Sequence, residues 1–309
     1  MHLIRHLPAE HDRATAVAIG NFDGVHLGHL AVIGAMQEVA CAQSLVPSVL
    51  TFEPHPRRFF AKDIAPFNIE RLRDKLERLR AAKVERLYMP RFDAIFAGMS
   101  AEDFLDVTLA KRLGAKAVVT GENFAFGKQR RGDITMLKKW GNMNGVRIIT
   151  LPPVEMDGEI CSSSAIRKAI TTGNVAHAAQ MLGRPYGLSG RVVHGQARGR
   201  TIGFPTANIA LAPGLITPAL GVYAVRAKVD GVRFDGVANF GIRPTVAVDK
   251  LPTLEVHLFD TLQEIYEKKM DIDFVDKLRD EMKFNGIDAL KEQIAKDCAA
   301  ARLALAGDV

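Results

Sequence analysis

The spacing of apolar residues changes near residue 184, and this change limits the chain to two different kinds of fold. Before it, segments with helical spacing separate short apolar runs at residues 16–19, 47–52, 86–89, 117–120 and 147–150. Such alternation predicts right-handed crossovers and a mainly parallel sheet. Because parallel sheets bind ligands beyond the carboxyl ends of their strands, the loops after these runs are candidate sites.

Helix boundaries can be predicted within the first pattern. Residues 69–79 carry apolar side chains at the 3-4-3 spacing of one buried helix face. Asn68, just before them, is predicted to cap that helix, since its side chain can accept a backbone hydrogen bond. Ser100 and Asp103 have the spacing of a capping box, and Gly114 is a predicted helix stop.

After residue 184, alternating apolar and polar residues recur at close spacing, at residues 191–194, 221–229, 232–240, 253–259 and 268–274. The Asp230-Gly231 pair between two of these runs predicts a type I′ hairpin. We therefore expect an antiparallel β-barrel, followed by a helix over residues 288–303 with apolar residues on one face. The sequence predicts two domains: an α/β, Rossmann-like domain over 1–184, and the barrel with its C-terminal helix over 185–309.

The balance of charges favours negatively charged ligands. Of the 309 residues, 41 are Lys or Arg and 35 are Asp or Glu, which gives a formal net charge of +6. A basic protein suits nucleotides, phosphorylated metabolites or nucleic acid. Nucleic acid is the weaker alternative, because the chain offers one Trp and 7% aromatic residues for stacking against bases. We expect small phosphorylated ligands and no nucleic-acid partner.

Cysteine usage and the lack of long apolar runs indicate the compartment. Cys41, Cys161 and Cys298 are odd in number and lack CxxC spacing, which argues against a disulfide framework or a zinc site. Residues 1–16 lack the continuous apolar core of a signal peptide. No apolar run approaches the ~20 residues that span a bilayer, so no membrane partner is expected. We expect a cytoplasmic protein, and the sequence leaves its oligomeric state open.

The first motif with chemical meaning covers residues 20–29, where a predicted strand ends and a helix begins. A helix start offers backbone N–H groups and the positive end of a dipole, which favours phosphate binding. Gly24 and Gly28 allow the backbone to approach a ligand closely. His26 and His29 can point into one space and stabilise charge on a pyrophosphate leaving group. The structural alternative is that both histidines hydrogen-bond within a glycine-rich turn.

Two further loops follow predicted strands. Residues 53–56 form a stiff Glu-Pro-His-Pro turn, in which His55 is either structural or touches phosphate. In residues 121–127, Phe124 and Phe126 can pack an apolar ring, while the Asn123 side chain can donate or accept hydrogen bonds. The structural alternative for this loop is an anchor in the core.

Residues 162–167 have the pattern of a helix start that contacts phosphate. The hydroxyls of Ser163 and Ser164 can cap N–H groups, and the guanidinium of Arg167 can clamp a phosphate. A plain N-cap explains one serine, whereas three in succession followed by arginine predict a phosphate contact.

In the second domain, the informative stretch is the glycine-rich segment 193–208. It lacks the GxxxxGK[ST] pattern, so the sequence excludes a Walker-type phosphate loop there. Its glycines can expose N–H groups to phosphate oxygens. The Thr206 hydroxyl and the Asn208 amide offer the hard oxygen ligands that Mg²⁺ prefers. The structural alternative is an ordinary Gly-Pro hairpin of a β protein.

A carboxylate on an alternating strand is a candidate base. Glu255 and His257 share one face of the strand, opposite Leu254, Val256 and Leu258. A carboxylate near a substrate hydroxyl can accept its proton as the oxygen attacks a phosphate. Periodicity alone favours a solvent-facing glutamate, and both interpretations hold if this face lines the barrel mouth. The charged run at 279–284 is typical of a solvated surface, because long Arg and Lys side chains often cover apolar groups.

Together, these motifs resemble a known family. His-x-Gly-His at 26–29 resembles the nucleotidylyltransferase superfamily. With the segments at 51–56, 121–127, 162–167, 193–208, 236–245, 254–260 and 279–284, the chain resembles the bacterial bifunctional riboflavin kinases/FAD synthetases over most of its length. One departure from the family pattern is Tyr266-Glu267, where relatives commonly have Tyr-Gly. The loss of that glycine changes the backbone angles open to the turn.

The resemblance implies an enzyme that phosphorylates riboflavin to FMN with ATP, and then adenylylates FMN to FAD with release of pyrophosphate. It implies that Mg²⁺ is bound through Thr206 and Asn208. It implies catalytic roles for Glu255, His26, His29 and Arg167. Contacts with ATP or flavin are implied for Gly20, Phe22, Asp23, Gly28, His55, Asn123, Ser163, Ser164, Gly195, Gly199, Arg200, Gly203, Asn239 and Arg279.

Three alternative functions stay open. The barrel domain can be a flavin-sensing or regulatory module attached to an adenylyltransferase. The chain can be a basic RNA or DNA binder, whose affinity would fall steeply with salt. The His-x-Gly-His site can also serve another phosphorylated acceptor.

Overall fold

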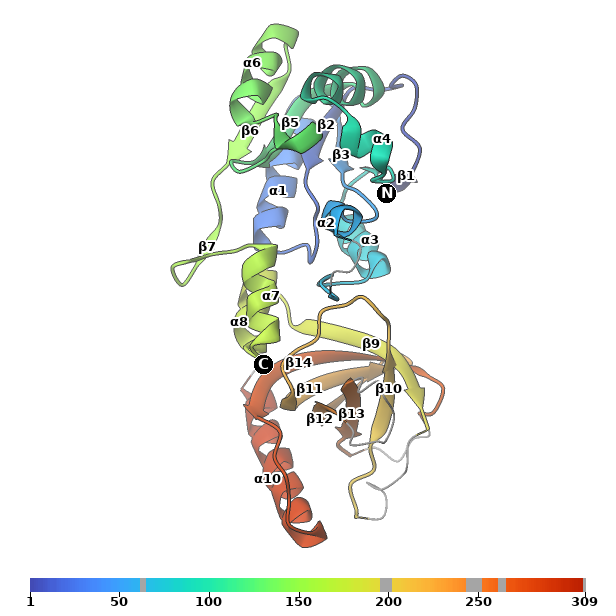
Figure 1. Ribbon diagram of the computed structural model, residues 1–309, viewed down its shortest axis with the longest axis vertical. Coiled ribbons are helices and arrows are strands. Elements are labelled where there is room, and N and C mark those ends of the chain that lie inside the picture. The colour runs from blue at the N-terminus through green and yellow to red at the C-terminus, as the bar shows by residue number, and fades with distance from the viewer. Residues whose placement is uncertain (62–64, 195–201, 243–251, 261–264, 308–309) are drawn as a thin grey trace. The chain divides into compact units, whose positions relative to one another are not determined.

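The computed structural model describes residues 1–61, 65–194, 202–242, 252–260 and 265–307 (Figure 1). The chain forms two compact units. The first consists of Met1–Ala65 and Arg71–Ser162, and the second of Pro66–Glu70 and Ser163–Val309. A short segment of the first half of the sequence, Pro66–Glu70, is therefore part of the second unit.

A six-stranded parallel sheet forms the centre of the first unit, with strand order β1-β4-β3-β2-β5-β6 (Figure 1). Its strands are β1 His2–Ile4, β2 Thr15–Ile19, β3 Val46–Leu50, β4 Arg86–Tyr88, β5 Ala115–Gly121 and β6 Arg147–Leu151. The predicted Rossmann-like sheet is confirmed, and the strands from β2 to β6 overlap the apolar runs of the sequence. Strand β1 was not predicted.

The central strand β2 is buried on both faces of the sheet. Ala16 and Ala18 pack in one apolar cluster with helix α1 (Leu27–Ala42). Val17 and Ile19 point the other way, into a second cluster that includes helix η1 (Phe104–Arg112). A strand covered on both faces is continuously apolar, which is why its sequence predicts a parallel sheet.

The remaining helices of this unit are α2 Pro56–Phe60, α3 Leu72–Ala81, α4 Ala94–Gly98, α5 Ala101–Asp103, η2 Lys128–Arg130 and α6 Ile134–Asn144. The predicted capping box is present, because Ser100 Oγ accepts the Asp103 N–H at 2.9 Å. The predicted Asn68 cap is wrong: α3 begins at Leu72, with Arg71 at the N-cap position. Asn68 instead pairs through its backbone with the segment around Leu215.

A closed antiparallel barrel forms the centre of the second unit, with strand order β10-β13-β12-β11-β14-β9 (Figure 1). Its strands are β9 Tyr186–Val193, β10 Ala207–Leu211, β11 Gly221–Val229, β12 Val232–Ile242, β13 Pro252–Leu258 and β14 Lys269–Arg279. Asp230 and Gly231 connect β11 to β12 with φ of 49° and 87°, as a type I′ turn requires. The predicted barrel is confirmed.

Among the residues that the structure describes, the helices of the second unit are α7 Ser163–Thr171, α8 Val175–Leu182 and α10 Ile287–Ala306. The predicted C-terminal helix is confirmed by α10, whose Ala301 and Leu305 pack against Val222, Ala224 and Val237 of the barrel wall. In the part of the chain that the structure describes, no helix combines the length and apolar character needed to cross a membrane.

Candidate functional site

The two histidines of the first motif lie in contact at the start of α1. His26 is the N-cap residue, and its Nδ1 accepts the backbone N–H of His29 at 3.4 Å. The two imidazole rings stack with centroids 3.6 Å apart and an interplanar angle of 26°. The spacing of the two histidines predicts that their rings point into the same space, and in the structure the rings are in contact.

The backbone donors at this helix start are engaged by the chain itself. The amides of Leu27 and Gly28 hydrogen-bond the sulfur of Cys161. The His29 amide donates to His26 Nδ1, and the Leu30 amide donates to the His26 carbonyl at 2.9 Å. The helix-start motif predicts free N–H groups here. In the structure, the imidazole rings and the helix dipole are instead the features that favour an anion.

The turn that leads into the histidines is held by two buried side chains. The Asn21 carbonyl accepts hydrogen bonds from Thr51 Oγ1 at 3.0 Å and from Lys75 Nζ at 2.7 Å. Phe22, with φ of 48°, is fully buried, and Asp23 is also buried. A Cβ at residue 20 would lie 3.2 Å from the Phe22 ring, so glycine fits this place. Thr51 and Lys75 were not predicted from the sequence.

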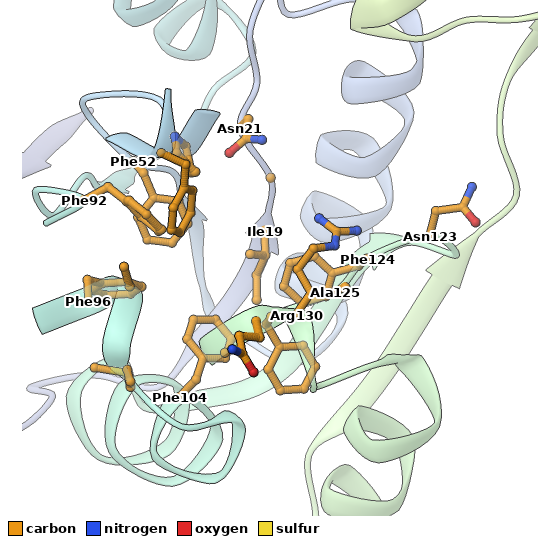
Figure 2. Close-up of a pocket in the computed structure, with 18 residues that line it drawn as sticks. Ile19, Asn21, Phe52, Phe92, Phe96, Phe104, Asn123, Phe124, Ala125 and Arg130 are labelled. Atoms are coloured by element: carbon orange, nitrogen blue, oxygen red, sulfur yellow. The ribbon is translucent and has the colours of Figure 1, made fainter. Parts of the chain in front are cut away.

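An aromatic cavity of about 550 Å³ lies at the carboxyl ends of β2 and β3, beside the loop after β5. Figure 2 shows Phe52, Phe92 and Phe96 on one side of Ile19, with Phe104 on another side. This cavity lies at the place where parallel sheets bind ligands. Most of these phenylalanines could not be predicted from a sequence motif, because they come from separate loops and helices.

The loop 121–127 contributes to the same cavity. Phe124 and Phe126 stack with ring centroids 5.4 Å apart, and Phe126 is buried while Phe124 is partly buried. Asn123 also lines the cavity and is exposed; its side chain lies apart from the phenylalanine cluster (Figure 2). The loop thus offers an apolar surface for a ring and a polar group at the rim.

His55 has a structural role in this unit. It is the N-cap residue of α2, and its Nδ1 accepts the Arg57 N–H at 3.1 Å. This hydrogen bond agrees with the structural interpretation of the Glu-Pro-His-Pro turn. A contact between His55 and phosphate stays a prediction.

The serine and arginine motif lies in the second unit. Helix α7 begins at Ser163, as the helix-start pattern predicts, and Ser164 occupies its first turn. Arg167 Nε donates to the Phe67 carbonyl at 2.7 Å, and its guanidinium lies 5.3 Å from the Phe67 ring centroid. That these side chains share a triphosphate with His26 and His29 stays a prediction, since the histidines belong to the first unit.

In the barrel, five side chains lie in one cross-strand row. Asn208 is opposite Glu255, and Glu255 is opposite Asn239 on its other neighbour. Asn239 in turn faces Val222, which is opposite Arg279. The row therefore brings four of the predicted site residues onto one surface of the barrel wall.

A cavity of about 260 Å³ lies over this surface. Thr206, Asn239, Glu255 and Arg279 line it, together with residues of α10. Leu254 and Val256, the neighbours of Glu255 along β13, are buried inside the barrel, so the alternation predicted for this strand is present. The polar face lines a cavity between the barrel wall and α10.

His257 supports the turn that presents Thr206. Its Nδ1 donates to the Pro205 carbonyl at 2.8 Å, and its ring meets Phe204 edge-on with centroids 5.6 Å apart. Gly203 precedes this turn with φ of 89°, which favours glycine. Gly195, Gly199 and Arg200, for which contacts with ATP or flavin are predicted, lie outside the described residues.

Arg279 is held by an ion pair. Its Nη2 and Nε donate to Asp297 of α10 at 2.7 and 2.9 Å, and Asp297 is buried. The guanidinium also lies 5.7 Å from the Phe284 ring centroid. Arg279 thus joins β14 to α10 at the cavity.

The turn at Tyr266-Glu267 is where this sequence departs from the Tyr-Gly of its relatives. Glu267 adopts φ of 61°, a left-handed conformation that glycine adopts more easily.

The oxygen donors of this surface suit a hard cation. A hydroxyl (Thr206), an amide (Asn208) and a carboxylate (Glu255) are the ligand types that Mg²⁺ prefers. Among the described residues there is no cluster of three His, Cys, Asp or Glu side chains arranged for a metal ion. A cation here would be held by these oxygens together with the phosphates of a substrate.

Comparison with known proteins identifies the family. Residues 8–165 match the family model described as FAD synthetase, and residues 182–305 match the one described as riboflavin kinase. The chain is 42% identical to the bifunctional riboflavin kinase/FMN adenylyltransferase of Haemophilus influenzae, over 93% of both chains. It is 41% identical to the Escherichia coli K12 protein of the same description, over 98% of this chain and 95% of that one.

The chain belongs to the bifunctional riboflavin kinase/FMN adenylyltransferase family. The Bacillus subtilis member is 41% identical over 94% of this chain and 93% of its own. A crystal structure described as a macrolide-efflux protein from Streptococcus pneumoniae aligns with a TM-score of 0.88 and 32% identity, covering 97% of this chain and 98% of that one. The family resemblance predicted from the motifs is thus confirmed.

Proposed function

We propose that the chain makes FMN from riboflavin and FAD from FMN, with ATP as the donor in both reactions. We assign FMN adenylylation to residues 1–184 and riboflavin phosphorylation to residues 185–309. The observation that carries the proposal is that each unit has a cavity of its own, lined by residues of the motifs found in the sequence. Gly20 and Asn21, from the turn that leads to the stacked histidines, line the aromatic cavity of the first unit, and Glu255 lines the cavity of the second together with Thr206 and Asn239.

For the kinase step, Glu255 accepts the proton of the primary hydroxyl of riboflavin as that oxygen attacks the γ-phosphate of ATP. Thr206 and Asn208 would hold Mg²⁺, which, when bound, neutralises phosphate charge. Asn239, next to Glu255 in the cross-strand row, orients the hydroxyl or the carboxylate. We infer contacts of Gly195, Gly199, Arg200 and Gly203 with the phosphates from the family motif.

For the adenylyl step, the phosphate of FMN attacks the α-phosphorus of ATP, and catalysis consists of positioning and charge stabilisation. His26 and His29 donate to the departing pyrophosphate. We propose that Arg167, Ser163 and Ser164 bind the triphosphate and that the Gly20 turn and Asp23 seat the nucleotide. The flavin ring lies in the phenylalanine cavity, whose apolar walls suit an aromatic ligand, with Asn123 at its rim.

We further propose that the partners are small molecules and that the enzyme works in the cytoplasm, where ATP is available. Binding of nucleic acid is not needed for either reaction. A filter-binding assay with RNA and DNA at increasing salt tests this point, and specific binding that competes with ATP or flavin would contradict it.

Chromatography of the products tests the function. Purified protein is mixed with riboflavin, ATP and Mg²⁺, and in a second reaction with FMN, ATP and Mg²⁺. The proposal predicts FMN and FAD in the first reaction and FAD in the second. FAD from FMN without any FMN from riboflavin would make the barrel unit a regulatory module instead. No flavin product in either reaction would refute the proposal.

A further inference from the structure

Cys161 lies against His26, and no step proposed above uses it. Its Sγ is 3.6 Å from His26 Nδ1, and the residue is 4% exposed. The two residues are 135 positions apart in the sequence. The Cys161 N–H donates to the Val154 carbonyl at 2.8 Å, which fixes the thiol-bearing segment independently of α1.

The contacts of His26 decide which ring nitrogen carries the proton. Nδ1 accepts the backbone N–H of His29, and a backbone N–H can only donate. In the neutral ring the proton is therefore on Nε2. A hydrogen bond from the Cys161 thiol to the same Nδ1 shares the single lone pair of that nitrogen with the His29 N–H, in a three-centre arrangement, and favours the same tautomer.

The thiol is suited to donate. Burial raises the pKa of Cys161, so the sulfur keeps its proton at neutral pH. The amides of Leu27 and Gly28 hydrogen-bond the sulfur as an acceptor. The S–H group can donate to the nearby ring nitrogen, which lies 3.6 Å from the sulfur.

Gly28 makes this contact possible. A Cβ at residue 28 would lie 3.1 Å from His26 Cε1 and 3.2 Å from the Cys161 carbonyl oxygen. Both distances are shorter than ordinary carbon contacts, so a side chain here would push the ring and the Cys161 segment apart.

We propose that Cys161 is a positioning residue for adenylyl transfer, whose thiol donates to His26 Nδ1 and keeps the Nε2–H of the ring directed to the departing pyrophosphate. The inference rests on the proposed adenylyltransferase function. Cys161 itself touches neither substrate nor the reacting atoms. Because a thiol is a weak donor, its loss should slow FAD formation by about two- to five-fold and not abolish it.

Two substitutions separate donation from packing. Cys161→Ser keeps a donor in a smaller side chain, whereas Cys161→Val fills the space without a donor. Positioning predicts that FMN adenylylation is near wild type in the serine variant and slowed in the valine variant. The opposite order would show that the thiol only fills space and would overturn the proposal. Riboflavin phosphorylation is the internal control, and we expect it unchanged in both variants.

A spectroscopic readout makes the inference testable without activity. Histidine labelled with ¹⁵N is followed by two-bond ¹H–¹⁵N correlation, with His26 assigned from a His26→Gln variant. We expect a protonated Nε2 and an unprotonated Nδ1, whose resonance moves downfield in Cys161→Val and returns in Cys161→Ser. A protonated Nδ1, or an Nδ1 resonance equal in all three proteins, overturns the inference. If this signature is present but no FAD forms, the proposed function fails and the contact stands.

Discussion

Asn208 and Glu255 lie directly opposite each other on strands β10 and β13. Residues opposite one another on one face of an antiparallel pair have Cβ atoms about 5 Å apart, so the two side chains can reach one phosphate group. A neutral amide and a carboxylate at this spacing suit the two tasks that we assign them, holding a metal–nucleotide and accepting a proton.

Asn208→Ala should weaken magnesium binding in the barrel unit. Because an amide oxygen is removed from a site with few charged donors, we expect the Mg²⁺ concentration for half-maximal riboflavin phosphorylation to rise about ten-fold. The measurement is the initial rate of FMN formation against Mg²⁺ concentration. The control is FAD formation from supplied FMN, whose Mg²⁺ dependence should stay as in the wild type. An unchanged kinase curve would remove Asn208 from the metal site.

His257→Ala should impair the kinase through the turn at Thr206. Without the hydrogen bond to the Pro205 carbonyl, the turn loses its support, and we expect the KM for ATP to rise about three- to ten-fold. His257→Gln is the matched variant, since its amide can still donate. Steady-state kinetics of riboflavin phosphorylation measure both. Equal KM values for the alanine variant and the wild type would show that the turn does not need His257.

Lys75→Met should destabilise the first unit. The buried ammonium group donates to the Asn21 carbonyl, and its removal leaves that carbonyl with Thr51 alone. We expect a loss of about 1–3 kcal/mol in the free energy of unfolding, together with slower FAD formation. Urea unfolding measures the stability, and Lys139→Met, at an exposed position of α6, is the control. A stability equal to the control would contradict the account of the turn.

Asp297→Ala should destabilise the second unit by about 3–5 kcal/mol, because it leaves the Arg279 guanidinium without its buried partner. The double variant Arg279→Met/Asp297→Leu removes both charges and should recover most of that stability. Thermal unfolding compares the variants. If Arg279 also contacts the flavin, the double variant still shows a raised KM for riboflavin. A single variant as stable as the wild type would contradict a structural role for the pair.

Much of the fold could be predicted because it depends on local patterns. The buried strand β2 and the Asp230-Gly231 hairpin each show their structure in a few consecutive residues. Strand β1 was missed because it has three residues, of which His2 is exposed, and so carries no clear period. Asn68 looks like a helix cap in the sequence, but backbone pairing with the Leu215 segment places it elsewhere.

The candidate site could be predicted only where a motif is continuous in the sequence. His26 and His29 are neighbours in one turn, and their contact follows from spacing. The Cys161–His26 contact and the Lys75–Asn21 hydrogen bond join distant segments, so no local pattern indicates them. For the Lys75–Asn21 hydrogen bond, the available signal was the position of Lys75 among the apolar residues of the α3 face, since a charged residue on a buried face needs a partner. The phenylalanine cavity is likewise assembled from separate loops.

The independence of the two sites is tested most directly with Glu255→Gln. The account predicts that riboflavin phosphorylation falls by about 10²- to 10⁴-fold, because the general base is lost. FAD formation from supplied FMN should continue at the wild-type rate. The measurement is chromatographic quantification of FMN and FAD in parallel reactions started from riboflavin and from FMN. Loss of both activities in a folded protein, or an unchanged rate of FMN formation, would contradict the account.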